Sequence, residues 1–403
     1  MNPSIKTVQG TTRLMFESVD LISNTVEDMH ETIARRAFVW SPPPQEKTYA
    51  HGAIATAVYD VIRRVNRSLQ KGVNHSFDLL NPGNSDTPDQ SKDIRFRATL
   101  NGVLGDHLED SKNPLAIPMT LLNNGDAVEL ERCALGESIP SASPHLVVLV
   151  HGLCHSELNW SRKERPSLDA KLTKNLDCTS LHLRYNTGRH ISTNGRELAA
   201  MLETLCAEWP VPVESLSLIG HSMGGLVIRS ACWYAQQKDN AWLEHLKRVL
   251  CLGTPHHGSH VAKAGHALDI LLKKSPYVAP LALAQKRSVG LKDLRHGNLL
   301  DEDWQDECCD VARQDNRRPV PLLAEVEYYF IAATIGRDHH DVLGHILGDL
   351  LVRLDSATGV HKEDLHRLHI KPDNCRVYTE KSHLDLLDDP RVHEQVIEWF
   401  QAA

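Results

Sequence analysis

The residues of this sequence that point most directly to chemistry form the pattern Gly-x-Ser-x-Gly between Gly220 and Gly224. An apolar run at residues 216–219 precedes the pattern, and apolar side chains continue at helical spacing over residues 226–231. Strand, sharp turn and helix follow one another, and glycines two residues either side of the apex remove side chains that would collide. The pattern predicts an exposed nucleophilic hydroxyl at Ser222.

A serine nucleophile of this kind needs a base, which comes last in the chain order serine, acid, histidine. His383 follows a short expected strand at residues 375–378 and precedes an amphipathic helical pattern at residues 392–400. We expect His383 to be the base because it stands between the final strand and the final helix.

Four aspartates follow an expected buried strand at residues 327–334 and compete for the role of the acid. Asp338 and Asp341 lie in a polar, histidine-rich run that is typical of a solvated segment. Asp355 precedes a serine and is suited to capping a turn or the start of a helix. Asp349 has a glycine before it and Leu-Leu-Val after it, so its backbone can be fixed while its carboxylate points inward. We prefer Asp349 as the acid and keep Asp355 as the alternative.

A second expected buried strand, residues 144–150, runs into His151 and Gly152. In lipase-like hydrolases, a loop at this point directs one backbone N–H at the reacting carbonyl oxygen, and the residue after the nucleophile supplies another. The expected oxyanion-hole donors are therefore the backbone N–H groups of Leu153 and Met223. The side chain of His151 is expected to hold the loop in place.

Five segments together resemble the serine lipases and esterases of the α/β-hydrolase superfamily: residues 151–152, 220–225 and 253–258 and the segments around Asp349 and His383. The resemblance is greatest to the branch typified by the inositol deacylase of glycosylphosphatidylinositol anchors and its bacterial relatives. Gly-Thr-Pro-His-His-Gly at residues 253–258 is the most diagnostic part of the resemblance. Residues 348–352 align with the family segment Gly-Asp-Gly-Leu-Val, and this chain has Leu350 where the second glycine is usual. The resemblance covers roughly residues 143–403 and implies an α/β-hydrolase fold, which is a mostly parallel sheet flanked by helices.

The N-terminal part of the chain has a different character. Apolar residues recur at helical spacing over residues 19–33 and 54–69, and residues 81–92 form a polar linker. We expect residues 1–115 to be an N-terminal helical extension and residues 116–403 to be the catalytic domain. The role of the extension stays open between packing on the core, dimerisation and contact with a lipid surface.

Two further segments belong to the expected catalytic domain. Residues 120–131 read as a β-hairpin that enters the main sheet. Residues 259–318 read as an insertion with helical parts, in the place where this fold carries a cap or lid over the serine.

The composition of the 403 residues agrees with a globular enzyme, since 41% are hydrophobic and 24% are charged. The net charge of -8 argues against a nucleic-acid partner, and no apolar run is long enough to span a membrane. The N-terminus lacks the pattern of a signal peptide, and nine scattered cysteines suit reduced thiols, so we expect a cytoplasmic protein. We expect neither a cofactor nor a metal, although histidines gather at 256–257 and at 339, 340 and 345.

These observations predict a serine hydrolase that cleaves carboxylic esters, of the lipase or carboxylesterase type, through an acyl-serine intermediate. The substrate class is a small-molecule or lipid ester. An intracellular polyester depolymerase, a thioesterase and an acyltransferase would use the same residues and remain alternatives. A non-catalytic interaction protein on a hydrolase scaffold is a further alternative, and the oligomeric state stays open.

Overall fold

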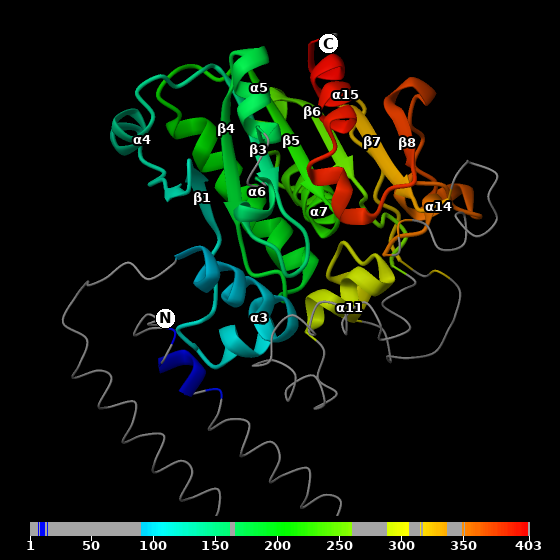
Figure 1. Cartoon of the computed structure of the whole chain (residues 1–403), viewed down its shortest axis with the longest axis horizontal. Coiled ribbons are helices and arrows are strands. Elements are labelled where there is room, and N and C mark those ends of the chain that lie inside the picture. The colour runs from blue at the N-terminus through cyan, green and yellow to red at the C-terminus, as the bar shows by residue number, and fades with distance from the viewer. Residues whose placement is uncertain are drawn as a thin grey trace, which may run out of the picture. The chain divides into compact units, whose positions relative to one another are not determined.

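The computed structural model describes a few residues near the N-terminus and most of the chain from residue 90 onward (Figure 1). The described residues are 7, 9–12, 14, 90–161, 166–259, 288–305, 315, 317–336, 349 and 351–401. Two compact units are distinguished. The first comprises residues 1–93, 110–115 and 279–285, and the second comprises residues 94–109, 116–278 and 286–403. The helices expected over residues 19–33 and 54–69 lie outside the described residues.

A single eight-stranded sheet organises the described part of the second unit, in the order β2-β1-β4-β3-β5-β6-β7-β8. Its strands are β1 Thr120–Asn123, β2 Asp126–Ala127, β3 His145–Val150, β4 Thr179–Arg184, β5 Ser215–His221, β6 Leu246–Leu252, β7 Glu327–Thr334 and β8 Cys375–Thr379. Strands β3 to β8 pair in parallel, whereas β1 pairs antiparallel with both β2 and β4. Four of the six parallel strands, β3, β5, β7 and β8, occupy stretches in which the sequence predicts a strand.

Helices cover both faces of this sheet (Figure 1). The described helices are α3 Gln90–Asp110, α4 Arg132–Ser138, η1 Glu157–Asn159, α5 Leu168–Leu176, α6 Ile191–Glu208, α7 Met223–Gln237, α8 Trp242–His245, α11 Val289–His296, α12 Glu302–Gln305, α14 Leu354–Ala357, η3 Asp364–His366, η4 Pro372–Asn374, η5 His383–Leu387 and α15 Pro390–Gln401. Helices α6 and α7 pack on one face, and α5 and α15 pack on the other. This is the α/β-hydrolase fold, as the sequence predicts.

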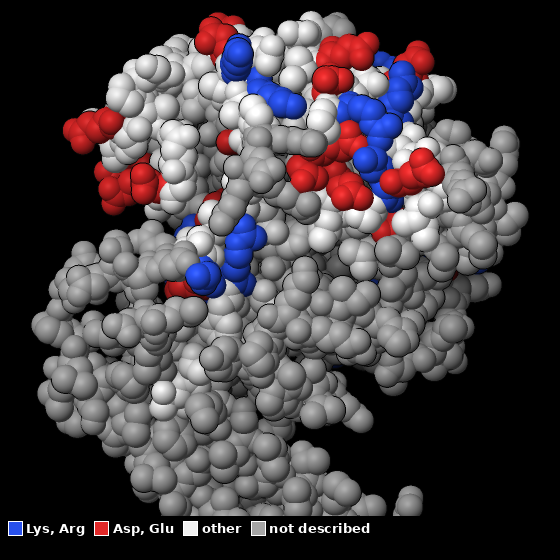
Figure 2. Space-filling model, viewed as in Figure 1, with Lys and Arg blue, Asp and Glu red and all other residues white. Residues whose placement is uncertain are grey.

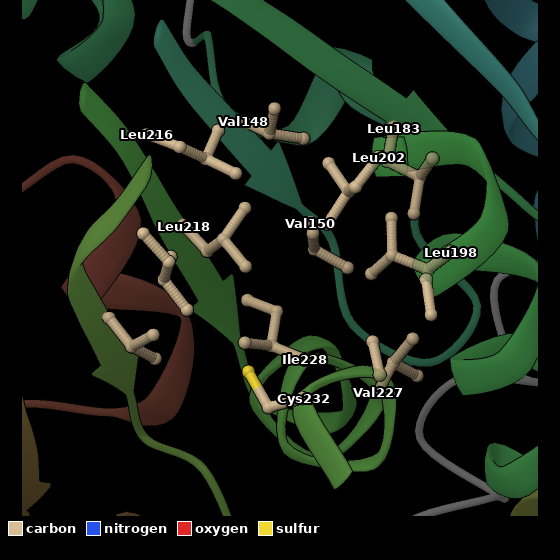
Figure 3. Close-up of a cluster of buried hydrophobic side chains, with 14 of the residues drawn as sticks. Val148, Val150, Leu183, Leu198, Leu202, Leu216, Leu218, Val227, Ile228 and Cys232 are labelled. Carbon is tan, nitrogen blue, oxygen red and sulfur yellow. The ribbon is translucent and has the colours of Figure 1, made fainter. Parts of the chain in front are cut away.

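Alternation along the strands divides the core into two layers. In β3, Val148 and Val150 face the α6 and α7 side, whereas Val147 and Leu149 face the α5 and α15 side. Figure 3 shows the first layer, in which buried side chains of three strands and two helices interlock: Val148, Val150, Leu183, Leu198, Leu202, Leu216, Leu218, Val227, Ile228 and Cys232. Burial on both faces holds the central strands, so their carboxyl ends form a fixed platform for the loops that follow.

The structure differs from the sequence expectations at two points, one in the hairpin and one near the end of the expected N-terminal extension. The hairpin is present, with Asn124 and Gly125 turning the chain at positive φ values of 49° and 95°, but its second strand is only Asp126–Ala127. The expected linker at residues 81–92 overlaps the start of α3, a helix over residues 90–110 that the apolar spacing does not reveal.

Part of the expected insertion at residues 259–318 packs into the body of the domain. Leu300 is fully buried in the α6 and α7 layer, and the buried carboxylate of Asp293 accepts a hydrogen bond from the first backbone N–H of α6 at 3.0 Å. Residues 288–305 are therefore anchored to the core. The cap stays a prediction for residues 260–287, which lie outside the described residues.

The described surface carries charges of both signs. Figure 2 shows acidic and basic side chains interspersed over one face. Ion pairs among the described residues include Lys381 with Asp389 at 2.9 Å, Arg391 with Asp389 at 3.0 Å and Lys371 with Glu327 at 2.6 Å. Among the described helices, none combines the length and the apolar character needed to cross a bilayer. The expectation about nucleic acid stays a prediction.

Candidate active site

The turn between β5 and α7 holds Ser222 in a strained conformation, with φ 55° and ψ −122°. Its two flanking glycines are required by close packing. A Cβ added to Gly220 would lie 2.5 Å from the backbone nitrogen of Gly225, and one added to Gly224 would lie 2.2 Å from the carbonyl oxygen of Val150. Sheet and helix thus close on the turn from both sides, which fixes the serine at the end of β5.

A buried aspartate–histidine pair lies on the loops after β7 and β8. Nδ1 of His383 is 2.6 Å from Oδ2 of Asp349, and the two residues are 3% and 1% exposed. Because a carboxylate only accepts, Nδ1 carries the proton and Nε2 presents its lone pair. Among the described residues Nε2 has no hydrogen-bond partner, so it is free to accept a proton.

The backbone around the aspartate fixes the direction of its carboxylate. Oδ1 of Asp349 accepts hydrogen bonds from the N–H groups of Leu351 at 2.9 Å and Val352 at 2.7 Å. The Asp349 N–H donates to the Val352 carbonyl at 3.2 Å, and its own carbonyl accepts from the N–H of His383 at 3.2 Å. Oδ1 is thereby held by backbone donors, and Oδ2 is left for the imidazole.

Three contacts bring the histidine to the serine. The N–H of Ser222 donates to the carbonyl of Leu252 at 2.8 Å, and a Cβ on the next residue, Gly253, would lie 2.9 Å from Cε1 of His383. The ring of His221, which precedes the serine, has its centroid 4.8 Å from that of His383. These contacts place the histidine–aspartate pair close to the serine turn, and within the described residues no hydrogen bond joins Ser222 to Nε2 of His383.

His221 supports the histidine from the other side. Its Nε2 lies 3.3 Å from the carbonyl oxygen of His383, so it donates a hydrogen bond to that backbone. Burial, followed by the neighbouring rings of His383 and His155, places the pKa of His221 well below its usual value. The ring therefore stays neutral and adds no positive charge beside His383.

The loop after β3 approaches the serine closely. A Cβ added to Gly152 would lie 2.9 Å from Cβ of Ser222, so only glycine fits there. Leu153 follows directly, and Met223 is the first residue of α7, where helix geometry leaves its N–H without an intrahelical acceptor. The structure thus places both expected oxyanion donors in segments that border Ser222.

His151 lies in a buried set of contacts within the loop after β3. It is 1% exposed, its Nδ1 lies 3.0 Å from the carbonyl of Gly152, and its ring stacks on Tyr185 with centroids 4.5 Å apart. The Tyr185 hydroxyl donates to the His151 carbonyl at 2.8 Å. Burial lowers the pKa of His151 to about 4, so this ring is neutral near pH 7.

Of the other three candidate acids, only Asp355 is among the described residues. Asp355 falls in the first turn of α14, where an acidic side chain favours the helix N-terminus. Asp338 and Asp341 lie outside the described residues. Of the two candidate acids that the structure describes, Asp349 and Asp355, Asp349 is the one that is hydrogen-bonded to His383.

Sequence reasoning misses the direct support that His221 and Gly253 give to His383. Gly253 has φ 59° and faces the imidazole ring, and its signal was its place at the end of an apolar strand, opening the motif at residues 253–258. Further along that motif, Nδ1 of His256 lies 3.4 Å from the guanidinium of Arg229. A metal cation there would face an existing positive charge, so this histidine is poorly suited to bind one.

A protein-family model matches part of this chain. Residues 140–298 match the model of a family described as "Putative serine esterase (DUF676)", a range that contains Ser222 and the loop after β3 but neither Asp349 nor His383. No curated protein matches the chain.

Solved structures are similar at low identity. The mature lipase BlEst2 of Bacillus licheniformis is 19% identical over 70% of this chain and 99% of that chain, with a TM-score of 0.42. An esterase of Pyrococcus furiosus, Pf2001, is 15% identical over 65% and 83%, with a TM-score of 0.37. An α/β-hydrolase fold protein of Chitinophaga pinensis is 9% identical over 65% and 91%, also with a TM-score of 0.37.

Proposed function

We propose that this chain is a serine hydrolase that cleaves carboxylic esters through an acyl-serine intermediate. The observation that carries the proposal is the buried hydrogen bond of 2.6 Å between Asp349 and His383, formed beside a serine held in a strained strand–helix turn. A nucleophile, a base with a free ring nitrogen and an acid that orients the base are the parts of acyl-transfer catalysis. The family model that matches residues 140–298 supports the same chemistry.

In the proposed mechanism, Nε2 of His383 accepts the hydroxyl proton of Ser222 while Oγ attacks the ester carbonyl. Asp349 stabilises the imidazolium that forms. The N–H groups of Leu153 and Met223 stabilise the oxyanion, and the imidazolium then gives its proton to the leaving alcohol. His383 then deprotonates a water molecule that attacks the acyl carbonyl, the bond to Oγ of Ser222 breaks, and the imidazolium returns its proton to Oγ. The products are an alcohol and a carboxylic acid, and the enzyme is regenerated.

The substrate subclass is proposed from the motif at residues 253–258, which resembles the inositol-deacylase branch. That resemblance favours a lipid or small-molecule ester. Thioesters, polyesters and transfer to an alcohol would use the same triad, so they are compared directly in the test.

A fluorophosphonate probe tests the nucleophile. We expect it to label Ser222 of the folded protein, as read by peptide mass spectrometry, and to leave Ser222→Ala unlabelled. Ser138→Ala, at an exposed serine in α4, is the matched control and should label like the parent. Absence of labelling in the folded parent would favour a non-catalytic scaffold.

A substrate panel then separates the ester proposal from its alternatives. kcat/KM is measured for p-nitrophenyl esters of increasing acyl length and for acyl thioesters of the same lengths. The proposal expects esters to be preferred at matched length. A consistent preference for thioesters would assign the triad to a thioesterase instead.

A further inference from the structure

Arg229 of α7 is a buried cation that has no anionic partner among the residues that the structure describes. It is 5% exposed, and its guanidinium donates to the carbonyl of Val320 at 2.7 Å and lies 3.4 Å from Nδ1 of His256. Across the part of the chain that the structure describes, no carboxylate lies within 4.0 Å of it, and its Nε has no hydrogen-bond partner. Because isolated buried charges are costly, folded proteins normally pair them. Arg229 lacks such a pair.

The neighbouring groups do not neutralise this charge. Burial, together with nearby arginines, holds the pKa of His256 well below its usual value and lowers that of His257 to about 3, so both rings are neutral at pH 7. Burial lowers the pKa of Arg229 only to about 10, which leaves it protonated. Arg317, close by, is already paired with Asp315 at 2.5 Å.

A cavity of about 380 Å³ opens onto Arg229. Four arginines (229, 317, 318 and 367) line it, against two aspartates (303 and 364), and the remaining lining residues carry no fixed charge. The carboxylate of Asp303 is taken up by backbone N–H groups, those of residues 299, 300 and 318, at 2.8 to 2.9 Å. Three of these arginines already have a carboxylate partner, since Arg317 pairs with Asp315, Arg318 lies 3.2 Å from Glu302 and Arg367 lies 4.0 Å from Asp364. The volume lies within the range of small-ligand sites, and Arg229 is the lining arginine that has no such partner among the described residues.

We propose that this cavity binds a small ligand through an oxyanion group, a phosphate or a carboxylate, whose charge is met by Arg229 together with the exposed arginines at its mouth, Arg318 and Arg367. Guanidinium groups bind both oxyanions through paired, charge-assisted hydrogen bonds. The ligand supplies the partner that Arg229 lacks.

This is a second site, separate from the serine. Arg229 follows Ser222 by seven residues, which is about 10 Å along a helix axis, and the cavity lining includes none of Ser222, Asp349 and His383. His256, which lines the cavity, belongs to the same loop as Gly253, which touches His383. The proposal stands whether or not the protein cleaves esters, because it concerns binding alone.

Calorimetric titration of the full chain tests the proposal, with inorganic phosphate in one arm and acetate in the other, at constant ionic strength set by chloride. We expect saturable binding with one site per chain in at least one arm. Binding of phosphate alone or of acetate alone identifies the oxyanion. No saturable binding in either arm overturns the proposal.

Variants identify the site. Arg229→Gln and Arg367→Gln should each weaken binding by about tenfold or more, because each removes a charge-assisted donor. Arg376→Gln, at an exposed arginine of β8 outside the cavity, is the matched control and should bind like the parent. If the mouth variant Arg367→Gln, which is exposed and does not depend on burial for folding, and the folded Arg229→Gln both bind like the parent, the proposal is wrong.

Thermal unfolding gives a second readout. If Arg229 binds an anion, adding that anion should raise the unfolding temperature of the parent protein. Arg229→Met should abolish that rise without lowering the unfolding temperature in anion-free buffer. A parent indifferent to both anions, with an Arg229→Met variant that is less stable in their absence, would make the arginine a purely structural anchor for Val320 and His256.

Discussion

Replacing Asp349 by asparagine should disable the proposed base while leaving the fold in place. The carboxylate is held by two backbone N–H groups on Oδ1, at 2.9 Å and 2.7 Å. In the variant, the amide oxygen will keep those two bonds, because turning the NH₂ group toward them would set donors against donors. The NH₂ group must then face Nδ1 of His383. Nδ1 becomes an acceptor and the proton moves to Nε2, so the base can no longer accept the proton of Ser222.

The expected size of the effect follows from what is lost. Reverting to the useful tautomer would cost the two backbone hydrogen bonds, and the negative charge that stabilises the imidazolium is gone in either case. We expect kcat to fall by about 10³- to 10⁴-fold, as for the loss of a triad acid in serine hydrolases. That corresponds to about 4 to 5 kcal/mol in the barrier, at about 1.4 kcal/mol for each factor of ten.

The assay is the hydrolysis of a short p-nitrophenyl ester, with circular dichroism and calorimetry to show that the variant is folded. Asp355→Asn, six residues away in the first turn of α14, is the matched control and should cost little. A loss of less than about tenfold in Asp349→Asn, or a larger loss in Asp355→Asn, would refute the reasoning and return the acid to an open question.

Three further predictions follow from the site and its supports. Gly152→Ala places a Cβ 2.9 Å from Cβ of Ser222 and should lower kcat/KM on short esters by about tenfold or more, whereas Gly136→Ala, whose Cβ would meet nothing within 4 Å, should leave kinetics unchanged. Gly220→Ala, whose Cβ would lie 2.5 Å from a backbone nitrogen of α7, should instead lower the free energy of unfolding by about 1 to 3 kcal/mol in denaturant titrations. The pKa of His151 is about 4 in the folded protein and 6.5 in the unfolded chain, so the unfolded chain binds the proton first and the free energy of unfolding falls as the pH drops from 6.5 toward 4. In His151→Gln, the slope of the free energy of unfolding against pH should be smaller by about 1.4 kcal/mol per pH unit. An unchanged slope would contradict the burial of His151 as a neutral ring.

The parts of the fold that the sequence predicts well are those that local pattern determines. Strand β7, expected over residues 327–334, forms over Glu327–Thr334, and the strand expected over residues 144–150 forms over His145–Val150. Both are continuous apolar runs buried on two faces, which few other structures explain. The turn at Ser222 is only partly local. Gly220 is needed by a contact with Gly225 in the same strand–helix unit, whereas Gly224 is needed because the carbonyl of Val150, at the end of the neighbouring strand β3, lies so close.

Helix α3 shows what local pattern leaves out. The apolar residues of α3 are not concentrated on one face, and the helix is kinked at Leu104, which has non-helical φ and ψ of −132° and 18°. What fixes the helix is partly long-range, since the side chain of Asn101 accepts a hydrogen bond from the N–H of Ile117 at 3.0 Å and the carbonyl of Gly102 accepts from Ser288 at 2.7 Å. Contacts of this kind leave no periodic signal in the sequence.

The candidate site follows the same division, and the sheet order explains why it can still be found. Strands β3, β5, β6, β7 and β8 are neighbours in the parallel sheet, so the loops after their carboxyl ends meet at one edge. Any chemistry-bearing residue on those loops is therefore a candidate, which is how Ser222, Asp349 and His383 are selected without knowledge of distances. The residues that set those distances are harder to find, because Gly253 and His221 act through what they touch. Gly253 leaves room for the imidazole ring of His383, and the neutral ring of His221 donates a hydrogen bond to the His383 carbonyl. Both contacts join loops that are distant in the sequence, so they are found only from the structure.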